Sequence, residues 1–286
     1  MGKGFLYYLS HAKINLRLEV LGKRADGYHE IRSVMSLISL ADRITIFKDL
    51  KKGIKIETDH PEIGEGEDNI VFRCVKKLLD RANHPGGVKI IIKKRIPIAA
   101  GLGGGSSNGA VSLLGVNRLL KLGFSKHELM DIGSSVGADI PFFLFFKPAI
   151  ALGKGDILYQ IPTFPTIWLI LIVPNFHLYT KDVYNGLKMR LTQDYSDIKI
   201  KVFDLNIDNI SDIIRNDLEK VSVRILPRIK ELKELLLAEG AYAASMSGSG
   251  PAVFGIFESK DKAKEAKERI KEKIRVDEKI FLCYTI

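Results

Sequence analysis

A glycine-rich segment between a strand-like run and a helix-like run constrains this chain most strongly. Residues 88–93 are rich in isoleucine and predict a strand, and residues 106–120 have helical spacing. Between them, residues 101–105 hold four glycines in five positions. Glycines let backbone N–H groups gather around an anion, and a helix N-terminus adds unpaired N–H groups and partial positive charge. Residues 97–107 therefore predict a phosphate-binding loop; the alternative is a flexible surface turn.

This loop differs from the common phosphate-binding motifs. A P-loop ends in Gly-Lys-Ser/Thr, and the loop contains no lysine. In a Rossmann fingerprint Ser106 would have to be glycine, and the next predicted segment is a helix rather than a strand ending in an acid. The HRD and DFG signatures of protein kinases are absent. The loop is thus of another kind, in which Ser106 and Ser107 can cap the helix or bind phosphate oxygens.

The order of strand-like and helix-like runs predicts two parts. Two prolines near residues 161–165 flank a change of character, so we expect domains at 1–163 and 164–286. The first part has predicted strands at 13–20 (half-buried), 42–47, 53–57 and 88–93, and predicted helices at 69–81, 106–120 and, from a Ser125/Glu128 capping box, 125–136. The second has a strand at 168–173, a helix around 181–191, a polar loop or insertion at 193–209, two helices, strands at 241–246 and 252–257, a charged helix at 260–275 and a strand at 280–285. That second order approximates βαββαβ.

Asp139 and Lys13 are candidate catalytic residues. Asp139 lies in Gly-Ala-Asp-Ile-Pro, where it can cap a helix or act as a general base for a hydroxyl nucleophile. Lys13 shares the polar face of a predicted strand with Asn15, and a solvated strand lysine is the alternative.

Two turn-like segments are candidate binding elements. Tyr28 and His29 follow Asp26-Gly27. They either bind a ligand or are solvated side chains in a turn. A second glycine cluster, residues 245–251, lies between two predicted strands. It is either a tight hairpin or a loop that closes over a bound substrate.

Composition narrows the ligand and the compartment. The 44 basic and 34 acidic residues leave a net charge of 44 − 34 = +10, which favours an anionic ligand. Because bases and acids alternate along the chain, a polyphosphate is favoured over nucleic acid. Cys74 and Cys283 have no metal-ligand spacing, and neither a secretory signal nor an apolar run of bilayer length is visible. We therefore expect a cytoplasmic protein with no membrane partner, as a monomer or weak homodimer.

Together the motifs resemble those of the GHMP small-molecule kinases. Three match in chain order: Ala12-Lys-Ile-Asn-Leu16, the loop Gly101–Ser107, and Ser247-Gly-Ser-Gly-Pro251. Arg24-Ala-Asp-Gly-Tyr-His29 and Gly137-Ala-Asp-Ile-Pro-Phe-Phe143 most resemble members that phosphorylate 4-diphosphocytidyl-2-C-methyl-D-erythritol in non-mevalonate isoprenoid synthesis.

The resemblance implies a fold and an activity. The fold would be α+β, with an N-terminal β/α nucleotide-binding domain and a C-terminal ferredoxin-like βαββαβ domain. The activity would be ATP-dependent phosphorylation of the C2 hydroxyl of that cytidine diphosphate substrate, with Mg²⁺ expected alongside ATP.

The resemblance also implies residue roles. Asp139 would be the catalytic base and Lys13 its partner. The implied ATP-binding residues are Asn69, Lys94, Pro97, Ile98, Ala99, Ala100, Gly101, Leu102, Gly103, Gly104, Gly105, Ser106 and Ser107. The implied substrate-binding residues are Asn15, Tyr28, His29, Thr180 and Tyr184. The metal ligands are not indicated by the sequence.

Other functions remain open from sequence. A homoserine or mevalonate type of GHMP kinase is one, although such substrates have no base for Tyr28 and His29 to read. A non-catalytic nucleotide-binding or RNA-binding protein is another. RNA binding calls for aromatic residues spaced along exposed strands, and Phe254 and Phe257 fall on opposite faces of their strand.

Overall fold

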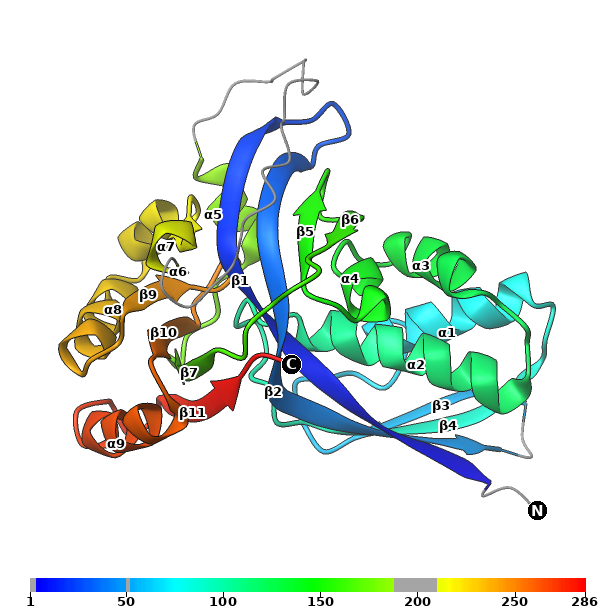
Figure 1. The fold of residues 1–286 in the computed structure, drawn as a ribbon. Coiled ribbons are helices and arrows are strands. Elements are labelled where there is room, and N and C mark those ends of the chain that lie inside the picture. Colours follow the sequence, from blue (N-terminus) through cyan, green and yellow to red (C-terminus); the bar gives the residue numbers. More distant parts are fainter. Residues whose placement is uncertain (1–3, 50–51, 188–209) are drawn as a thin grey trace. The chain divides into compact units, whose positions relative to one another are not determined.

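The computed structural model describes residues 4–49, 52–187 and 210–286, which form two compact units (Figure 1). The first unit gathers Met1–Ala12, Leu40–Pro97 and Gly103–Phe146, and the second gathers Lys13–Ser39, Ile98–Leu102 and Lys147–Ile286. Two long strands, β1 (Phe5–Lys23) and β2 (His29–Lys48), therefore supply residues to both units. The same is true of the glycine-rich loop.

The first unit contains strands of one sheet and a group of helices that pack on one another. Residues 43–48 of β2 pair antiparallel with β4 (Gly86–Lys93), and β4 pairs parallel with β3 (Gly53–Thr58). The helices are α1 (Ile70–Arg81), α2 (Gly104–Leu120), α3 (Lys126–Ser134) and α4 (Ile140–Phe145). α1 and α4 both pack against α2, and α3 packs against α4 (Figure 1).

Local sequence explains two of these helices. In α1 the apolar residues Val71, Val75 and Leu78 recur at helical spacing and are buried. In α3 the predicted capping box is confirmed: Ser125 Oγ accepts from the Glu128 N–H at 3.3 Å, and the Glu128 carboxylate accepts from the Ser125 N–H at 2.8 Å.

In the second unit, a four-stranded antiparallel sheet has the order β11-β7-β10-β9. Its strands are β7 (Trp168–Val173), β9 (Ala243–Met246), β10 (Val253–Phe257) and β11 (Lys279–Tyr284). The accompanying helices are α5 (Thr180–Asn185), α6 (Ile210–Ile213), α7 (Glu219–Ile225), α8 (Arg228–Ala238) and α9 (Lys260–Lys271). This is the strand order of a ferredoxin-like βαββαβ fold, so the predicted fold class is confirmed.

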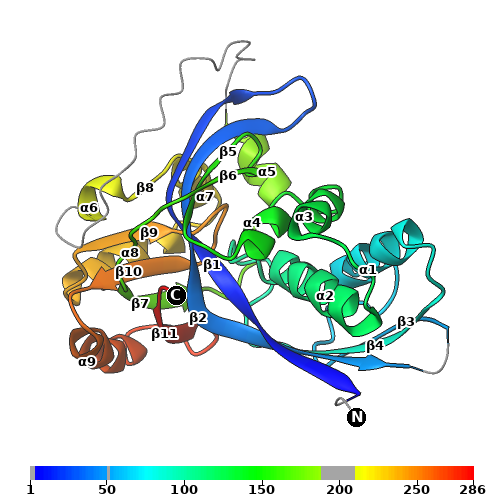
Figure 2. The same ribbon diagram turned by 45° about the vertical axis from the view of Figure 1, so that its right-hand side comes forward.

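The core of the second unit lies between this sheet and its helices. Leu232 and Leu236 of α8 and the apolar stripe of α9 join sheet residues such as Ile170 and Phe257 in one buried cluster. Because α8 and α9 belong to the same cluster, both cover the same face of the sheet, as the rotated view of Figure 2 also shows. The sequence predicts an apolar stripe of Ala263, Ala266, Ile270 and Ile274. The first three are buried in α9, whereas Ile274 lies beyond the end of the helix and is partly buried.

Three short strands complete the second unit. β5 (Ala149–Leu152) pairs antiparallel with both β2 and β6 (Ile157–Gln160). β8 (Arg215–Asn216) pairs parallel with β1. None of these three strands was indicated by the sequence, since each has only two to four residues.

Several sequence expectations need correction. The predicted half-buried strand at 13–20 is part of β1, and its polar face is buried too: Lys13, Asn15 and Glu19 are at most 5% exposed. The apolar run after Asp139 forms α4. The helix predicted around 181–191 is α5, which ends at Asn185, and its predicted residues from 188 on lie outside the described residues. The polar stretch predicted at 193–209 lies wholly outside them. Of the helices in the described part of the chain, none has the length and apolar character needed to cross a bilayer.

Candidate active site

The glycine-rich loop ends at the N-terminus of α2. Gly103 precedes the helix in a left-handed conformation (φ 68°), and the helix begins at Gly104, two residues before the predicted start. The N–H groups of Gly104, Gly105 and Ser106 therefore stand in the first turn, where no carbonyl of the same helix reaches them. These groups and the helix dipole favour an anion at this point.

The two serines do not cap the helix, which corrects one of the two roles considered for them. Both lie inside the first turns of α2, and Gly103 takes the capping position without a side-chain bond. Ser107 is buried, and its hydroxyl lies 2.7 Å from the Ser10 hydroxyl, which also lies 2.7 Å from Asn108 Oδ1. The Ser107 N–H donates to the Gly103 carbonyl at 2.9 Å.

Lys94 lies beside this helix N-terminus. A Cβ built on Gly104 would be 3.2 Å from Lys94 Nζ, so the ammonium group is close to the first turn. Lys94 forms an ion pair with Asp42, whose carboxylate also accepts from the N–H groups of Arg95 at 2.7 Å and Ile96 at 2.9 Å. Asp42 is fully buried and therefore fixes the lysine in place. The Lys94 ammonium, its charge balanced by Asp42, thus lies beside the helix N-terminus as a fixed hydrogen-bond donor.

In the second unit, the earlier part of the loop touches the second glycine cluster. The Ser247 hydroxyl donates to the Gly101 carbonyl at 3.1 Å, and the Ala252 N–H donates to the Ala100 carbonyl at 3.3 Å. Gly101 has φ +74°, and a Cβ there would lie 2.1 Å from the Ser247 carbonyl oxygen. Only glycine permits this approach. The cluster is therefore packed against the first glycine loop. It also connects the antiparallel strands β9 and β10, as the hairpin alternative predicts, and its closure over a substrate stays a prediction.

Lys13 lies at this same junction. Its N–H donates to the Leu102 carbonyl at 3.0 Å, and a Cβ on Gly248 would lie 3.2 Å from Lys13 Nζ. The ammonium group donates to Asn15 Oδ1, and Asn15 Nδ2 donates to the Ser33 hydroxyl at 2.8 Å. Lys13 is 4% exposed, so the solvated-lysine alternative is wrong.

Asp139 belongs to the first unit. It precedes α4 with helical backbone angles and makes no side-chain cap hydrogen bond. The capping role considered for it is therefore not what the structure has. The residue is half-buried.

His29 lies against one aromatic ring in the second unit, and Tyr28 precedes it in the chain. The rings of His29 and Tyr184 lie 4.9 Å apart between centroids, and Lys154 Nζ lies 5.2 Å from the ring centroid of Tyr28. Tyr28 is 53% exposed and so has a free ring surface. Burial, and then the charge of Lys23, lowers the pKa of His29 below its ordinary value. A neutral imidazole at pH 7 offers one donor and one acceptor to a base edge.

Thr180 and Asn69 are each held by a partner. Thr180 Oγ1 lies 2.9 Å from Ser249 Oγ, which places Thr180 on the second glycine cluster. Asn69 caps α1: its Oδ1 accepts from the Val71 N–H at 2.8 Å and its Nδ2 donates to the Gly64 carbonyl at 2.7 Å. Both ends of the Asn69 amide are thus used within the fold.

The structure therefore gathers the predicted residues into two sets. Lys94, Pro97, Asn69, Asp139 and the residues from Gly103 to Ser107 are in the first unit; Lys13, Asn15, Tyr28, His29, Thr180, Tyr184 and the residues from Ile98 to Leu102 are in the second. Sequence reasoning missed Asp42, which holds Lys94, and Ser33, which holds Asn15. Neither stands at a motif spacing, so the sequence carried no local signal for either contact.

Comparison with known proteins identifies the family. The chain matches the model of the GHMP kinases N terminal domain over residues 69–147 and that of the GHMP kinases C terminal over residues 200–276. These ranges lie on either side of the boundary predicted at 163–164, which stays a prediction.

Relatives and solved structures agree. A 4-diphosphocytidyl-2-C-methyl-D-erythritol kinase of Syntrophus aciditrophicus is 47% identical over 91% of this chain and 93% of its own. One of Acetivibrio thermocellus is 41% identical over 92% and 93%. A crystal structure of 4-(cytidine 5'-diphospho)-2C-methyl-D-erythritol kinase superposes with TM-score 0.78 at 30% identity, covering 98% of this chain and 99% of the other.

A more distant structure shares the fold alone. Homoserine kinase from Cytophaga hutchinsonii has a TM-score of 0.74 at 17% identity, covering 100% of this chain and 98% of the other. The family assignment rests on the closer relatives. This chain belongs to the 4-diphosphocytidyl-2-C-methyl-D-erythritol kinase family of the GHMP kinases.

Proposed function

We propose that this kinase transfers the γ-phosphoryl group of ATP to the C2 hydroxyl of 4-diphosphocytidyl-2-C-methyl-D-erythritol, giving the 2-phosphate and ADP, in isoprenoid precursor synthesis. The observation that carries the substrate assignment is the pair of His29 and Tyr184 rings, with the exposed Tyr28 next to His29 in the chain. Such an arrangement suits a nucleobase, because aromatic rings stack on its faces and a neutral imidazole can hydrogen-bond to its edge. Homoserine and mevalonate contain no base.

The nucleotide end of the reaction needs positive potential aimed at phosphate oxygens. The first turn of α2 supplies N–H groups from Gly104, Gly105 and Ser106, and Lys94 supplies a cation held by Asp42. Phosphoryl transfer demands little covalent chemistry of a protein and depends on positioning and charge compensation. These groups hold the phosphate chain and offset its charge.

The acceptor end needs a base. We assign to the Asp139 carboxylate the removal of the proton from the C2 hydroxyl as that oxygen bonds to the γ-phosphorus. The bond between the γ-phosphorus and the β–γ bridging oxygen breaks, and ADP leaves with its electron pair. Lys13 supplies positive charge to the transferred group, and its bond to Asn15 fixes the direction of the ammonium.

Magnesium accompanies ATP in such reactions, where it neutralises phosphate charge. Within the described ranges, no group of three or more His, Cys, Asp or Glu side chains could form a protein-only metal site. That fits an ion bound chiefly by ATP phosphates and water, which needs only one or two protein oxygens. The Ser106 hydroxyl, in the first turn of α2, would supply one such oxygen.

The test is ADP release by the purified chain with ATP, Mg²⁺ and one acceptor at a time. We expect turnover with the cytidine diphosphate substrate and none with homoserine, mevalonate or galactose. Turnover with one of the other alcohols instead would overturn the substrate and the role of His29 while leaving the nucleotide loop intact. Absence of turnover with every acceptor would refute the proposal.

A further inference from the structure

A short segment of the second unit holds the second glycine cluster by its backbone. Asn216 Nδ2 donates to the carbonyl oxygens of Met246 and Gly248, each at 2.8 Å. Its Oδ1 accepts from the Leu218 N–H at 3.0 Å. One side-chain amide therefore joins the turn before α7 to two carbonyls on either side of Ser247.

Two neighbours of Asn216 extend this hold. Glu219 Oε2 accepts from the Met246 N–H at 3.2 Å and from the Ser245 hydroxyl at 3.3 Å. The Ser222 hydroxyl, fully buried, donates to the Ser249 carbonyl at 3.1 Å. The second glycine cluster is thus hydrogen-bonded to three side chains, those of Asn216, Glu219 and Ser222. We call the segment of residues 216–222 the bracket.

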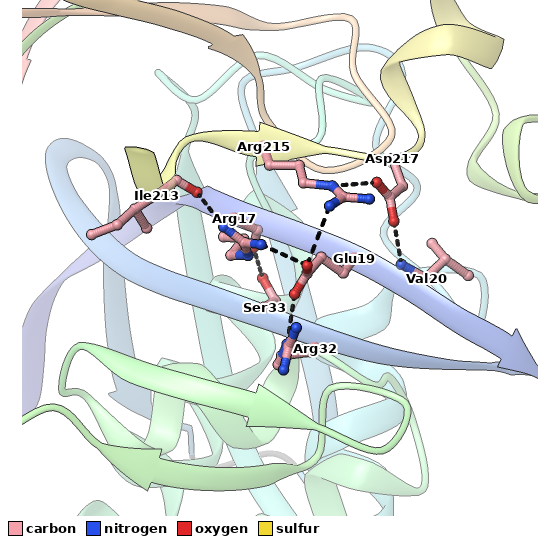
Figure 3. Close-up of polar contacts among 8 residues, drawn as sticks. All are labelled: Arg17, Glu19, Val20, Arg32, Ser33, Ile213, Arg215 and Asp217. Carbon is pink, nitrogen blue, oxygen red and sulfur yellow. Dashed lines mark hydrogen bonds and ion pairs between the residues drawn. The ribbon is translucent and has the colours of Figure 1, made fainter. Parts of the chain in front are cut away.

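The bracket is in turn bonded to β1, the strand that carries Lys13, and Figure 3 shows one of these contacts, between Asp217 and Val20. Arg215 and Asn216 pair with Arg17 and Leu18 of β1. Asp217 accepts from the Val20 N–H at 3.0 Å, and its own N–H donates to the Leu18 carbonyl at 2.9 Å.

Charged side chains reinforce the same junction. Glu19 lies between Arg17, at 2.7 Å, and Arg32, at 2.6 Å, and Arg215 approaches it at 3.7 Å (Figure 3). Burial would raise the pKa of Glu19, but the hydrogen bonds and charges of Arg17 and Arg32 outweigh it and lower the pKa to about 2. The carboxylate is therefore ionised at any physiological pH, and the arginines remain ordered around it.

We propose that Asn216 is a positioning residue of this kinase. Asn216 donates hydrogen bonds to the Met246 and Gly248 carbonyls and itself pairs with β1. It thereby fixes the position of the second glycine cluster relative to β1, the strand that carries Lys13. The cluster also contacts Gly101 through Ser247 and Thr180 through Ser249, so a shift of its backbone displaces both of these predicted site residues. This inference rests on the proposed function only in taking those residues as the site.

The test replaces Asn216 by Asp in the full chain. This change keeps the volume and the acceptor for the Leu218 N–H, but it puts an acceptor where two carbonyl oxygens lie at 2.8 Å. The matched control is Asn117→Asp. Asn117 Nδ2 donates to the Phe124 carbonyl at 2.8 Å, and its Oδ1 accepts from the Phe124 N–H at 3.1 Å, in a turn of the first unit.

A role confined to stability would lower the melting temperature of both variants and leave kcat per folded molecule unchanged. Positioning predicts more: for Asn216→Asp, a fall in kcat of about 10-fold to 100-fold, since misplacement by about 1 Å has effects of that order. It also predicts faster hydrogen exchange of the amides of residues 245–250 than in Asn117→Asp. If Asn216→Asp does not fold, Asn216→Ala removes the same donors without adding charge, and the same outcomes apply.

Unchanged exchange at residues 245–250, or a kcat equal to that of Asn117→Asp, would overturn the positioning role. The exchange measurement needs no substrate, and kcat is taken with whichever acceptor the wild-type chain uses. A wrong substrate assignment is therefore seen in the wild-type chain and is distinct from a failure of this inference.

Discussion

Replacing Gly101 by Ala tests the junction of the two glycine loops most directly. A Cβ there would lie 2.1 Å from the Ser247 carbonyl oxygen, whereas real Cβ contacts essentially never fall under 3.0 Å. The loops must therefore separate by at least 3.0 − 2.1 = 0.9 Å. The left-handed φ of +74° adds a second cost, about 1–2 kcal/mol for a residue with a side chain.

The two costs can be separated with Gly240→Ala. Gly240 also has a positive φ, +96°, but a Cβ there meets nothing within 4 Å. Gly240→Ala should lose about 1–2 kcal/mol of stability, which lowers the melting temperature by a few degrees, and Gly101→Ala should lose more because it adds the clash with Ser247. Only Gly101→Ala should also lower kcat, by about 100-fold, since a displacement near 1 Å at a reacting centre has that effect.

The assay is steady-state ADP release with both substrates varied, together with thermal unfolding of each variant. A kcat for Gly101→Ala within about twofold of that for Gly240→Ala would refute the reasoning. It would mean that the loops separate without disturbing the site.

Three further outcomes are expected. Asp139→Asn should lower kcat by about 10²–10⁴-fold and leave ATP affinity, measured by calorimetry, unchanged; wild-type turnover would contradict the assignment of the base. His29→Ala should raise the KM of the cytidine substrate about 10-fold while the KM of ATP stays constant, and an unchanged KM would contradict the base contact. Glu19 has a folded-state pKa of about 2, below its ordinary 4.5, so its contribution to stability is present above about pH 4.5 and is lost as pH falls toward 2. Denaturant unfolding across that range should show a steeper loss for the wild-type chain than for Glu19→Gln, and parallel curves would contradict the pKa.

Local signals in the sequence predicted much of the fold. The capping box of α3, the apolar stripe of α9 and the glycine loop before α2 each lie within a few residues, where spacing and backbone preference decide the structure. The βαββαβ order followed from the sequence of such segments. Strands as short as β5, β6 and β8 have too few residues for periodicity to show.

The surroundings of the site were harder to predict than its residues. Alternation in β1 put Lys13 and Asn15 on one face but could not tell what covers that face, and burial of both faces was missed. The partners that fix the site come from far along the chain, since Asn216 binds Gly248 and Ser247 binds Gly101. Such contacts depend on tertiary packing, which no local pattern encodes.

The division of β1 and β2 between the two units bears on the order in which the protein folds during synthesis. Every segment of the first unit has been translated by Phe146, so that unit can form while the ribosome is still working. The second unit also contains Lys13–Ser39, which is synthesised early. Two partners of that segment are synthesised much later: β8 pairs with β1, and the Ile286 N–H donates to the Leu37 carbonyl. The half of β2 in the second unit gains β5 soon after Phe146, but the matching half of β1 lacks its partner β8 until more than a hundred residues after its own synthesis. During that interval it is an unpaired strand edge, which favours aggregation.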